Sequence, residues 1–243
     1  MRYDTQYRSY NYSSYFPTGV KWLLIANVAL FVPFYLSAAI AEHMMLLALV
    51  PVAVVYHFSI WQLFTYMFLH GGIEHILFNM LALWMFGMTL EQDWGTRRFL
   101  KYYFLCGVGA GICDVAVNAL MHNWGTRTIG ASGAIFGLLL AFGVLYPNQQ
   151  VLFFFLFPMK AKYMVMIVGA IAFLGALHVN SGVSDFAHLG GMAFGYAYLR
   201  LRFVRFDMGY FRREYDAWKL RRAKKRFQVY LRKHGSDRDT FVN

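Results

Sequence analysis

Three short clusters of chemically capable side chains interrupt otherwise apolar stretches of the sequence. They read His70-Gly-Gly-Ile-Glu-His75-Ile-Leu-Phe-Asn79, Gly130-Ala-Ser132-Gly and Ala187-His188-Leu-Gly-Gly191-Met-Ala-Phe-Gly195. Serine is a weak nucleophile until a neighbouring base removes its proton, and histidine, with an ordinary pKa near ~6.5, is such a base at neutral pH. These residue types therefore indicate serine-type hydrolysis, provided that the fold brings the three clusters together.

The composition predicts the setting of these clusters. Hydrophobic residues make up 59% of the 243-residue chain and charged residues 14%, against roughly 45–50% and 25% in ordinary soluble domains. So much apolar surface excludes a disordered chain and argues against a soluble domain, whose surface could not hide it. The composition predicts an all-α polytopic membrane protein with one membrane domain.

Six apolar segments have nearly the ~20 residues that a helix needs to cross the hydrocarbon of a bilayer. They are 20–40, 71–90, 99–121, 129–146, 163–177 and 186–204. The fourth and fifth are short, and 151–157 could extend the fifth. Segment 41–70 is too apolar for a plain loop, so we expect short helices at the membrane interface, with a re-entrant hairpin as the alternative.

Positive charge predicts the orientation of the six spans. With a cytoplasmic N-terminus, 22 of the 23 Lys and Arg residues lie inside and only Arg127 lies outside, as the positive-inside rule requires. Both termini are then cytoplasmic. We expect an N-terminal segment 1–19, a membrane domain 20–205 and a basic tail 206–243. Because that tail follows a span directly, it favours anionic lipid over nucleic acid as its partner.

This topology places all three polar clusters at the outer ends of spans two, four and six. Polar groups inside a membrane are costly unless they are paired or hydrated, so their shared depth favours one site. His75 and Asn79 lie one helical turn apart on a common face. Glycines at similar spacing, Gly133 with Gly137 and Gly191 with Gly195, allow spans four and six to approach closely. Ser132 and His188 could then form a hydrogen bond.

The combined pattern resembles the rhomboid family of intramembrane serine proteases. The likeness rests on Trp61-Gln62, the 70–79 cluster, Glu91 with Gly95, Gly130-Ala-Ser-Gly-Ala-Ile-Phe-Gly137 and the 187–195 cluster. The resemblance implies a six-transmembrane-helix bundle with an interfacial helical loop between its first two spans. It implies Ser132 as the nucleophile and His188 as its base, a dyad without a third carboxylate. His75, Asn79 and the backbone N–H of Ser132 would hold the oxyanion. Gly130 would belong to the same catalytic loop as Ser132.

Further residues take supporting roles from the same resemblance. His70 would support the site through hydrogen bonding, and Glu91 would brace the first loop and the inner end of span two. Phe136 would pack on the catalytic histidine. Gly191 and Gly195 would support the site from the same helix face as His188. The resemblance also implies transmembrane proteins, single-pass or multi-pass, as substrates, and no cofactor or metal. The expected location is the prokaryotic plasma (inner) membrane.

Three other functions compete with this interpretation. The histidines could form the path of a transporter, although few polar residues continue toward the inner side. They could bind a metal in a metalloprotease, although no His-Glu-x-x-His sequence occurs. A catalytically silent binder of membrane helices would keep the fold, but intact Ser132 and His188 argue against it. Outside the three clusters, Asp114 and Asn118 are one helical turn apart and could pair with each other or with water.

Overall fold

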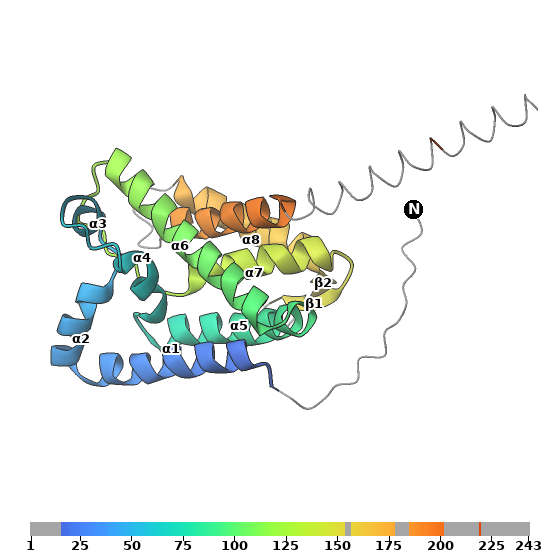
Figure 1. Cartoon of the computed structure of the whole chain (residues 1–243), viewed down its shortest axis with the longest axis horizontal. Coiled ribbons are helices and arrows are strands. Elements are labelled where there is room, and N and C mark those ends of the chain that lie inside the picture. The colour runs from blue at the N-terminus through green and yellow to red at the C-terminus, as the bar shows by residue number, and fades with distance from the viewer. Residues whose placement is uncertain (1–15, 154–156, 178–184, 202–218, 220–243) are drawn as a thin grey trace, which may run out of the picture. The chain divides into compact units, whose positions relative to one another are not determined.

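The computed structural model describes residues 16–153, 157–177, 185–201 and 219 (Figure 1). The chain divides into two units, residues 1–197 and 198–243. Of the second unit, only 198–201 and Lys219 are described, all helical. Most of the predicted N-terminal segment and nearly all of the basic tail therefore lie outside the described residues.

The first helix is followed by a chain of short helices. Helix α1 spans Thr18–Leu36 and contains Pro33. It is followed by α2 (Ala38–Met44), η1 (Met45–Leu47), α3 (Pro51–Tyr56), α4 (Gln62–Thr65) and η2 (Tyr66–Phe68). None of these exceeds seven residues, so none can cross a bilayer alone. The predicted helical character of this loop is confirmed.

A buried glutamine holds the short helices together. The Gln62 side chain is 5% exposed. Its amide nitrogen donates to the Leu46 carbonyl at 3.1 Å, and its oxygen accepts from the Val50 N–H at 3.1 Å. One side chain thus satisfies backbone groups that the helix breaks leave free.

Five longer helices form the bundle that carries the three clusters. They are α5 (Ile73–Trp94), α6 (Thr96–Leu120), α7 (Ser132–Leu145), α8 (Ala161–Ala176) and the helix 185–201. Gly95 alone separates α5 from α6, and its φ of +76° suits a residue without a Cβ. Among the described residues, α1, α5 and α6 are long and apolar enough to cross a membrane. All six predicted segments contain a helix, while the count of six crossings stays a prediction.

The segment after α7 is a correction to the sequence interpretation. Strands β1 (Gln150–Phe153) and β2 (Phe157–Lys160) pair antiparallel, with Gln150 opposite Lys160. The described residues 151–153 and 157 of the stretch 151–157 therefore do not extend the fifth helix. Pro158 lacks an N–H and interrupts a helix, whereas Val151 and Phe153 favour a strand.

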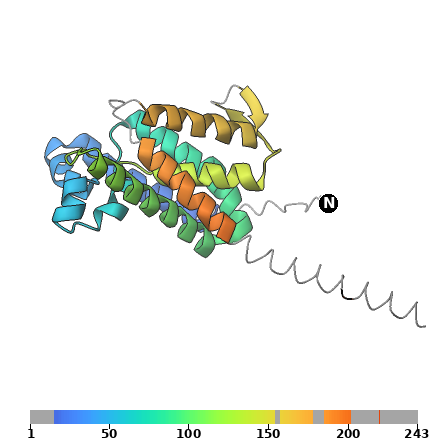
Figure 2. The same cartoon turned by 90° about the horizontal axis from the view of Figure 1, so that it is seen from above.

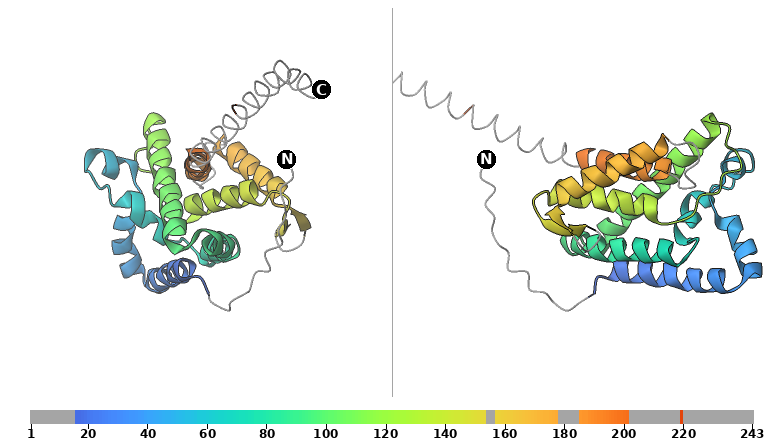
Figure 3. Two further views of the ribbon diagram at one scale, coloured as in Figure 1. Left: turned by 45° about the vertical axis from the view of Figure 1, so that its right-hand side comes forward. Right: turned by 180° about the vertical axis from the view of Figure 1, so that it is seen from behind.

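Helix α7 is the most enclosed element of the first unit. It packs against α5, α6 and α8, and Figure 3 (left) shows it between these helices, with the view from above in Figure 2. The close packing uses glycines. An added Cβ at Gly133 would lie 2.5 Å from Ala110 of α6, and one at Gly137 would lie 2.5 Å from Cys106 Sγ. Small residues thus allow an apolar helix to be surrounded on several sides.

Glu91 ties the C-terminal end of α5 to the beginning of α1. Its carboxylate accepts from the N–H groups of Gly19 and Val20, both at 2.7 Å. It also accepts from the Thr96 hydroxyl at 2.5 Å. The predicted brace at this end of α5 is present, but its partner is the beginning of α1 rather than the first loop. A carboxylate suits this place because the first N–H groups of a helix lack intrahelical acceptors.

Replacing Glu91 with glutamine should destabilise the bundle. Glutamine offers one acceptor oxygen and no charge, so buried N–H groups of α1 lose a charged partner. We expect the Tm of Glu91→Gln in detergent to fall by about 5–10 °C, equivalent to about 2–3 kcal/mol. Glu74→Gln is the matched control, because Glu74 is exposed on the same helix. Equal Tm values for the two variants would contradict the role of Glu91.

Candidate active site

Ser132 lies at the first turn of α7, directly after a backbone turn that only glycine adopts easily. Gly130 has a φ of +119°, and its N–H donates to the Tyr66 carbonyl at 2.9 Å. The turn places the half-buried Ser132 side chain at the N-terminus of α7. Free N–H groups and the positive end of the helix dipole meet there, which favours negative charge beside Ser132.

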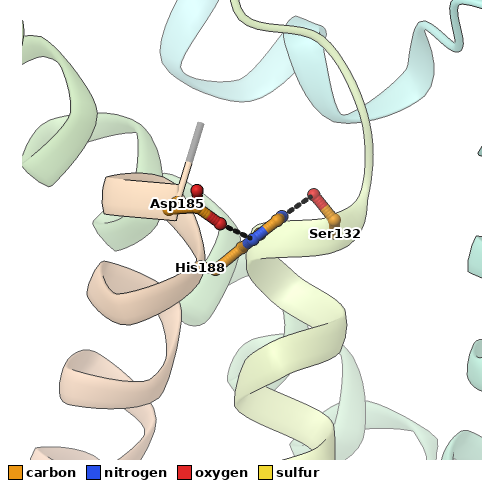
Figure 4. Close-up of polar contacts among 3 residues, drawn as sticks. All are labelled: Ser132, Asp185 and His188. Carbon is orange, nitrogen blue, oxygen red and sulfur yellow. Dashed lines mark hydrogen bonds and ion pairs between the residues drawn. The ribbon is translucent and has the colours of Figure 1, made fainter. Parts of the chain in front are cut away.

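His188 contacts Ser132 directly. Its Nε2 lies 2.8 Å from Ser132 Oγ (Figure 4), so the hydrogen bond predicted between the two segments is present. The Phe136 ring, one turn along α7 from Ser132, stacks on the imidazole with centroids 4.1 Å apart and planes 2° apart. Stacking fixes the plane of the imidazole and keeps Nε2 directed at the hydroxyl.

The two helices that carry Ser132 and His188, α7 and the helix 185–201, come into close contact at glycine residues. A Cβ added to Gly191 would collide with the Gly133 carbonyl oxygen, and one added to Gly137 would lie 3.2 Å from the Gly191 carbonyl oxygen. Gly195 differs from the prediction. It faces α6, where an added Cβ would lie 2.5 Å from Tyr102 Oη. Gly191 thus allows the helix 185–201 to pack closely on α7, and Gly195 allows the same helix to pack closely on α6.

His75 and Asn79 face the turn that precedes Ser132. A Cβ added to Gly130 would lie 2.6 Å from His75 Nε2 and 3.7 Å from Asn79 Nδ2. The Gly71 N–H donates to His75 Nδ1 at 3.4 Å. A neutral His75 then carries its proton on Nε2, the nitrogen that faces Gly130. Asn79 is 6% exposed, and its Nδ2 has no partner among the described residues.

The arrangement brings a paired hydroxyl and imidazole together with two hydrogen-bond donors. These four side chains come from α5, α7 and the helix 185–201. The family model of the Rhomboid domain matches residues 57–205, which contain all of them. The chain belongs to the rhomboid family.

The chain is also similar in sequence to curated rhomboid proteins. RHOMBOID-like protein 1 of Arabidopsis thaliana is 34% identical over 159 residues, 65% of this chain and 38% of that protein. Rhomboid protease GluP of Bacillus subtilis is 34% identical over 136 residues, 56% of this chain and 25% of GluP. Rhomboid protein 1, mitochondrial, of Saccharomyces cerevisiae is 32% identical over 134 residues, 54% of this chain and 38% of that protein.

These matches cover well under half of each relative's own length. Together with the apolar helices they make this rhomboid chain an integral membrane protein. One of the three relatives carries a mitochondrial name, so the prokaryotic plasma membrane stays a prediction.

His70 contacts the site in a different way from the one expected of the rhomboid position. It is fully buried, and its ring packs edge-on against that of His75 with centroids 5.0 Å apart. Neither ring nitrogen has a hydrogen-bond partner among the described residues. Burial lowers the pKa of His70 to about 3, so this ring is neutral at pH 7 and supports His75 by packing.

A polar cluster on α6 holds the turn before Ser132 in place. Asn118 Nδ2 donates to Asp114 Oδ1 at 3.1 Å, which confirms the predicted pairing. The Thr128 hydroxyl donates to Asp114 Oδ2 at 2.8 Å, and the backbone of Thr128 pairs with that of Leu49. Asp114 thus fixes the loop that leads into α7, which is a positioning role.

The structure also places a carboxylate that the sequence interpretation missed. Asp185 Oδ1 lies 3.5 Å from His188 Nδ1 (Figure 4). The family resemblance led us to expect a serine and histidine without a third group. The signal was present in the sequence, because Asp185 precedes His188 by three residues and such residues share a helix face. In the part of the chain that the structure describes, no group of three metal-ligating side chains occurs.

Proposed function

We propose that this rhomboid protein is an intramembrane serine endopeptidase that cleaves transmembrane helices of other membrane proteins near their outer ends. The observation that carries the proposal is the 2.8 Å contact between Ser132 Oγ and His188 Nε2 at the beginning of an enclosed apolar helix. The printed name of the relative GluP, a rhomboid protease, supports it.

The reaction begins with proton transfer. Ser132 Oγ attacks the carbonyl carbon of the scissile peptide bond while its proton passes to His188 Nε2. The electron pair of the C=O bond moves to the carbonyl oxygen. The proton on His188 then goes to the departing amine, which leaves an ester between Ser132 and the substrate. Water hydrolyses that ester with His188 again acting as the base.

His75 and Asn79 stabilise the oxyanion in this scheme. Nε2–H of His75 and Nδ2–H of Asn79 face the turn next to Ser132, and the N–H of Ser132 completes the set. Donors that are in place before the reaction avoid the cost of reorganising solvent around the new charge. The amide nitrogen of Asn79, which has no partner among the described residues, fits a group whose acceptor appears only during the reaction.

The site predicts the class of substrate. A peptide bond inside a regular transmembrane helix is shielded by its own backbone hydrogen bonds, so the substrate helix must unwind before Ser132 can attack. Glycine or proline near the scissile bond eases unwinding. Water must also reach the ester, which requires a hydrophilic opening toward the predicted outer side.

The basic tail would bind anionic lipid at the opposite surface, with both termini cytoplasmic.

Two runner-up functions use the same residues differently. A binder of membrane helices without catalysis would need neither the contact between Ser132 and His188 nor two further donors. A transporter would need polar groups that continue through the bundle. Further along α7 from Ser132, however, the buried side chains are apolar, such as Leu138, Ala141 and Phe142. The geometry therefore supports the peptidase best.

The proposal is tested with the purified full chain in liposomes that contain a reporter transmembrane protein. We expect two fragments, with the new termini inside the reporter's transmembrane segment by mass spectrometry. Cleavage should continue at an unchanged rate in EDTA, because the proposed chemistry needs no ion. Loss of cleavage in EDTA and recovery with Zn²⁺ would contradict the proposal and favour the metalloprotease. An intact reporter under all conditions would favour the binder.

A further inference from the structure

Asp185 lies on the side of the His188 ring that faces away from Ser132. Its Oδ1 is 3.5 Å from Nδ1, while Nε2 of the same ring is 2.8 Å from Ser132 Oγ (Figure 4). Carboxylate, imidazole and hydroxyl therefore follow one another across the site. The side chains of Asp185 and His188 are each 12% exposed, so solvent only partly screens a charge between them.

Two neighbours hold the carboxylate and the ring in this arrangement. Phe136 stacks on the imidazole and fixes its plane. Gly175 of α8 leaves the space that the second carboxylate oxygen occupies, because a Cβ added at Gly175 would collide with Asp185 Oδ2. The carboxylate is thus enclosed between α8 and His188. A solvent-facing acid would need no such space.

We propose that Asp185 is a positioning residue that acts on the reaction through His188. This inference rests on the proposed peptidase function. The carboxylate keeps the proton of neutral His188 on Nδ1, so that the lone pair of Nε2 faces the Ser132 hydroxyl. When the Ser132 proton moves to Nε2 and Oγ bonds to the carbonyl carbon, His188 becomes positively charged. The Asp185 carboxylate stabilises that charge.

A structural role is the alternative that the test must separate. An acid near the N-terminal end of a helix, as Asp185 is in the described range 185–201, also stabilises the helix through its dipole. Loss of that interaction would lower stability and leave the chemical step of folded enzyme unchanged. Loss of the proposed interaction would lower kcat, because a charged His188 exists only after proton transfer.

The direct test is Asp185→Asn, which keeps the shape of the side chain and removes its charge. We expect kcat for the reporter to fall by about 10- to 100-fold, with KM changed by less than about twofold. The rate at which a fluorophosphonate labels Ser132 should fall in parallel. In a His188→Ala background, Asp185→Asn should cause no further loss, because the carboxylate then has no ring to act on.

A second variant moves the carboxylate without changing it. Gly175→Ala fills the space beside Oδ2 and should lower kcat in the same direction as Asp185→Asn. Gly169→Ala is the matched control on α8. A Cβ there would lie 3.3 Å from the end of the flexible Met192 side chain, so kcat should stay within about twofold of wild type.

The outcomes separate this inference from the proposed function. Wild-type kcat in Asp185→Asn, or a change in Tm without a change in kcat, would overturn the role of Asp185 and leave the peptidase intact. A further loss in the His188→Ala background would also overturn it. If wild type cleaves no reporter, the proposed function fails instead, and the labelling rates of Ser132 still decide whether Asp185 acts through His188.

Discussion

Ser132→Ala should abolish cleavage of a reporter transmembrane protein and leave the fold unchanged. The substitution removes only the hydroxyl, whose recorded partner is His188 Nε2, and alanine fits the first turn of α7. Without the nucleophile no ester forms, so we expect kcat/KM to fall by at least about 1,000-fold. Gel analysis of reporter fragments measures the loss, and thermal unfolding in detergent checks that Tm is retained.

Ser37→Ala is the matched control for this result. Ser37 is the N-cap of α2 and accepts from the Ile40 N–H at 3.4 Å, so its loss affects one short helix and no catalytic group. Cleavage by Ser37→Ala should stay near the wild-type rate. If purified Ser132→Ala cleaved the reporter as fast as wild type, Ser132 would not be the nucleophile.

His188→Ala and Asn79→Ala should both lower kcat, by very different amounts. Removing the base leaves Ser132 protonated, so His188→Ala should lose at least about 1,000-fold. Asn79→Ala removes one of three oxyanion donors and should lose about 100-fold in kcat, the lower end of the roughly 100- to 1,000-fold (about 2.7–4 kcal/mol) that such a donor contributes, because two other donors remain. KM of Asn79→Ala should change little, since the oxyanion exists only after attack. Steady-state kinetics in one detergent measure both variants.

Asn27→Ala controls for the loss of a buried asparagine. The amide of Asn27 bonds only to the Leu23 carbonyl of its own helix among the described residues, so its kcat should match wild type. An effect of Asn79→Ala on KM alone would place Asn79 in substrate binding. A wild-type kcat for Asn79→Ala, with most activity retained by His188→Ala, would show both roles to be wrong.

The position of the helices could be predicted from sequence because each apolar run is long enough to need burial or lipid. The approach of Ser132 to His188 could be predicted as well, since glycine spacing fixes which helix faces meet. The strands β1 and β2 could not, because a short apolar run suits either a helix or a strand until Pro158 is weighed.

Contacts between side chains far apart in the chain were the part that sequence could not supply. Glu91 bonds to Gly19 and Val20, more than 70 residues away, and no local pattern on α5 names that partner. His70 packs edge-on against the ring of His75, a contact that the sequence did not predict. Asp185 could have been found from its helical spacing to His188, but the space left by Gly175 depends on how α8 packs.

The most direct measurement is the labelling of the folded protein by a fluorophosphonate, followed by mass spectrometry of its peptides. Only a serine whose proton is accepted by a nearby base attacks such a reagent quickly. The structure predicts that the label attaches to Ser132 in wild type, and that His188→Ala and Ser132→Ala are labelled far more slowly or not at all. Labelling that is absent from wild type, located at another serine, or equal in all three proteins would contradict a serine peptidase built on Ser132 and His188.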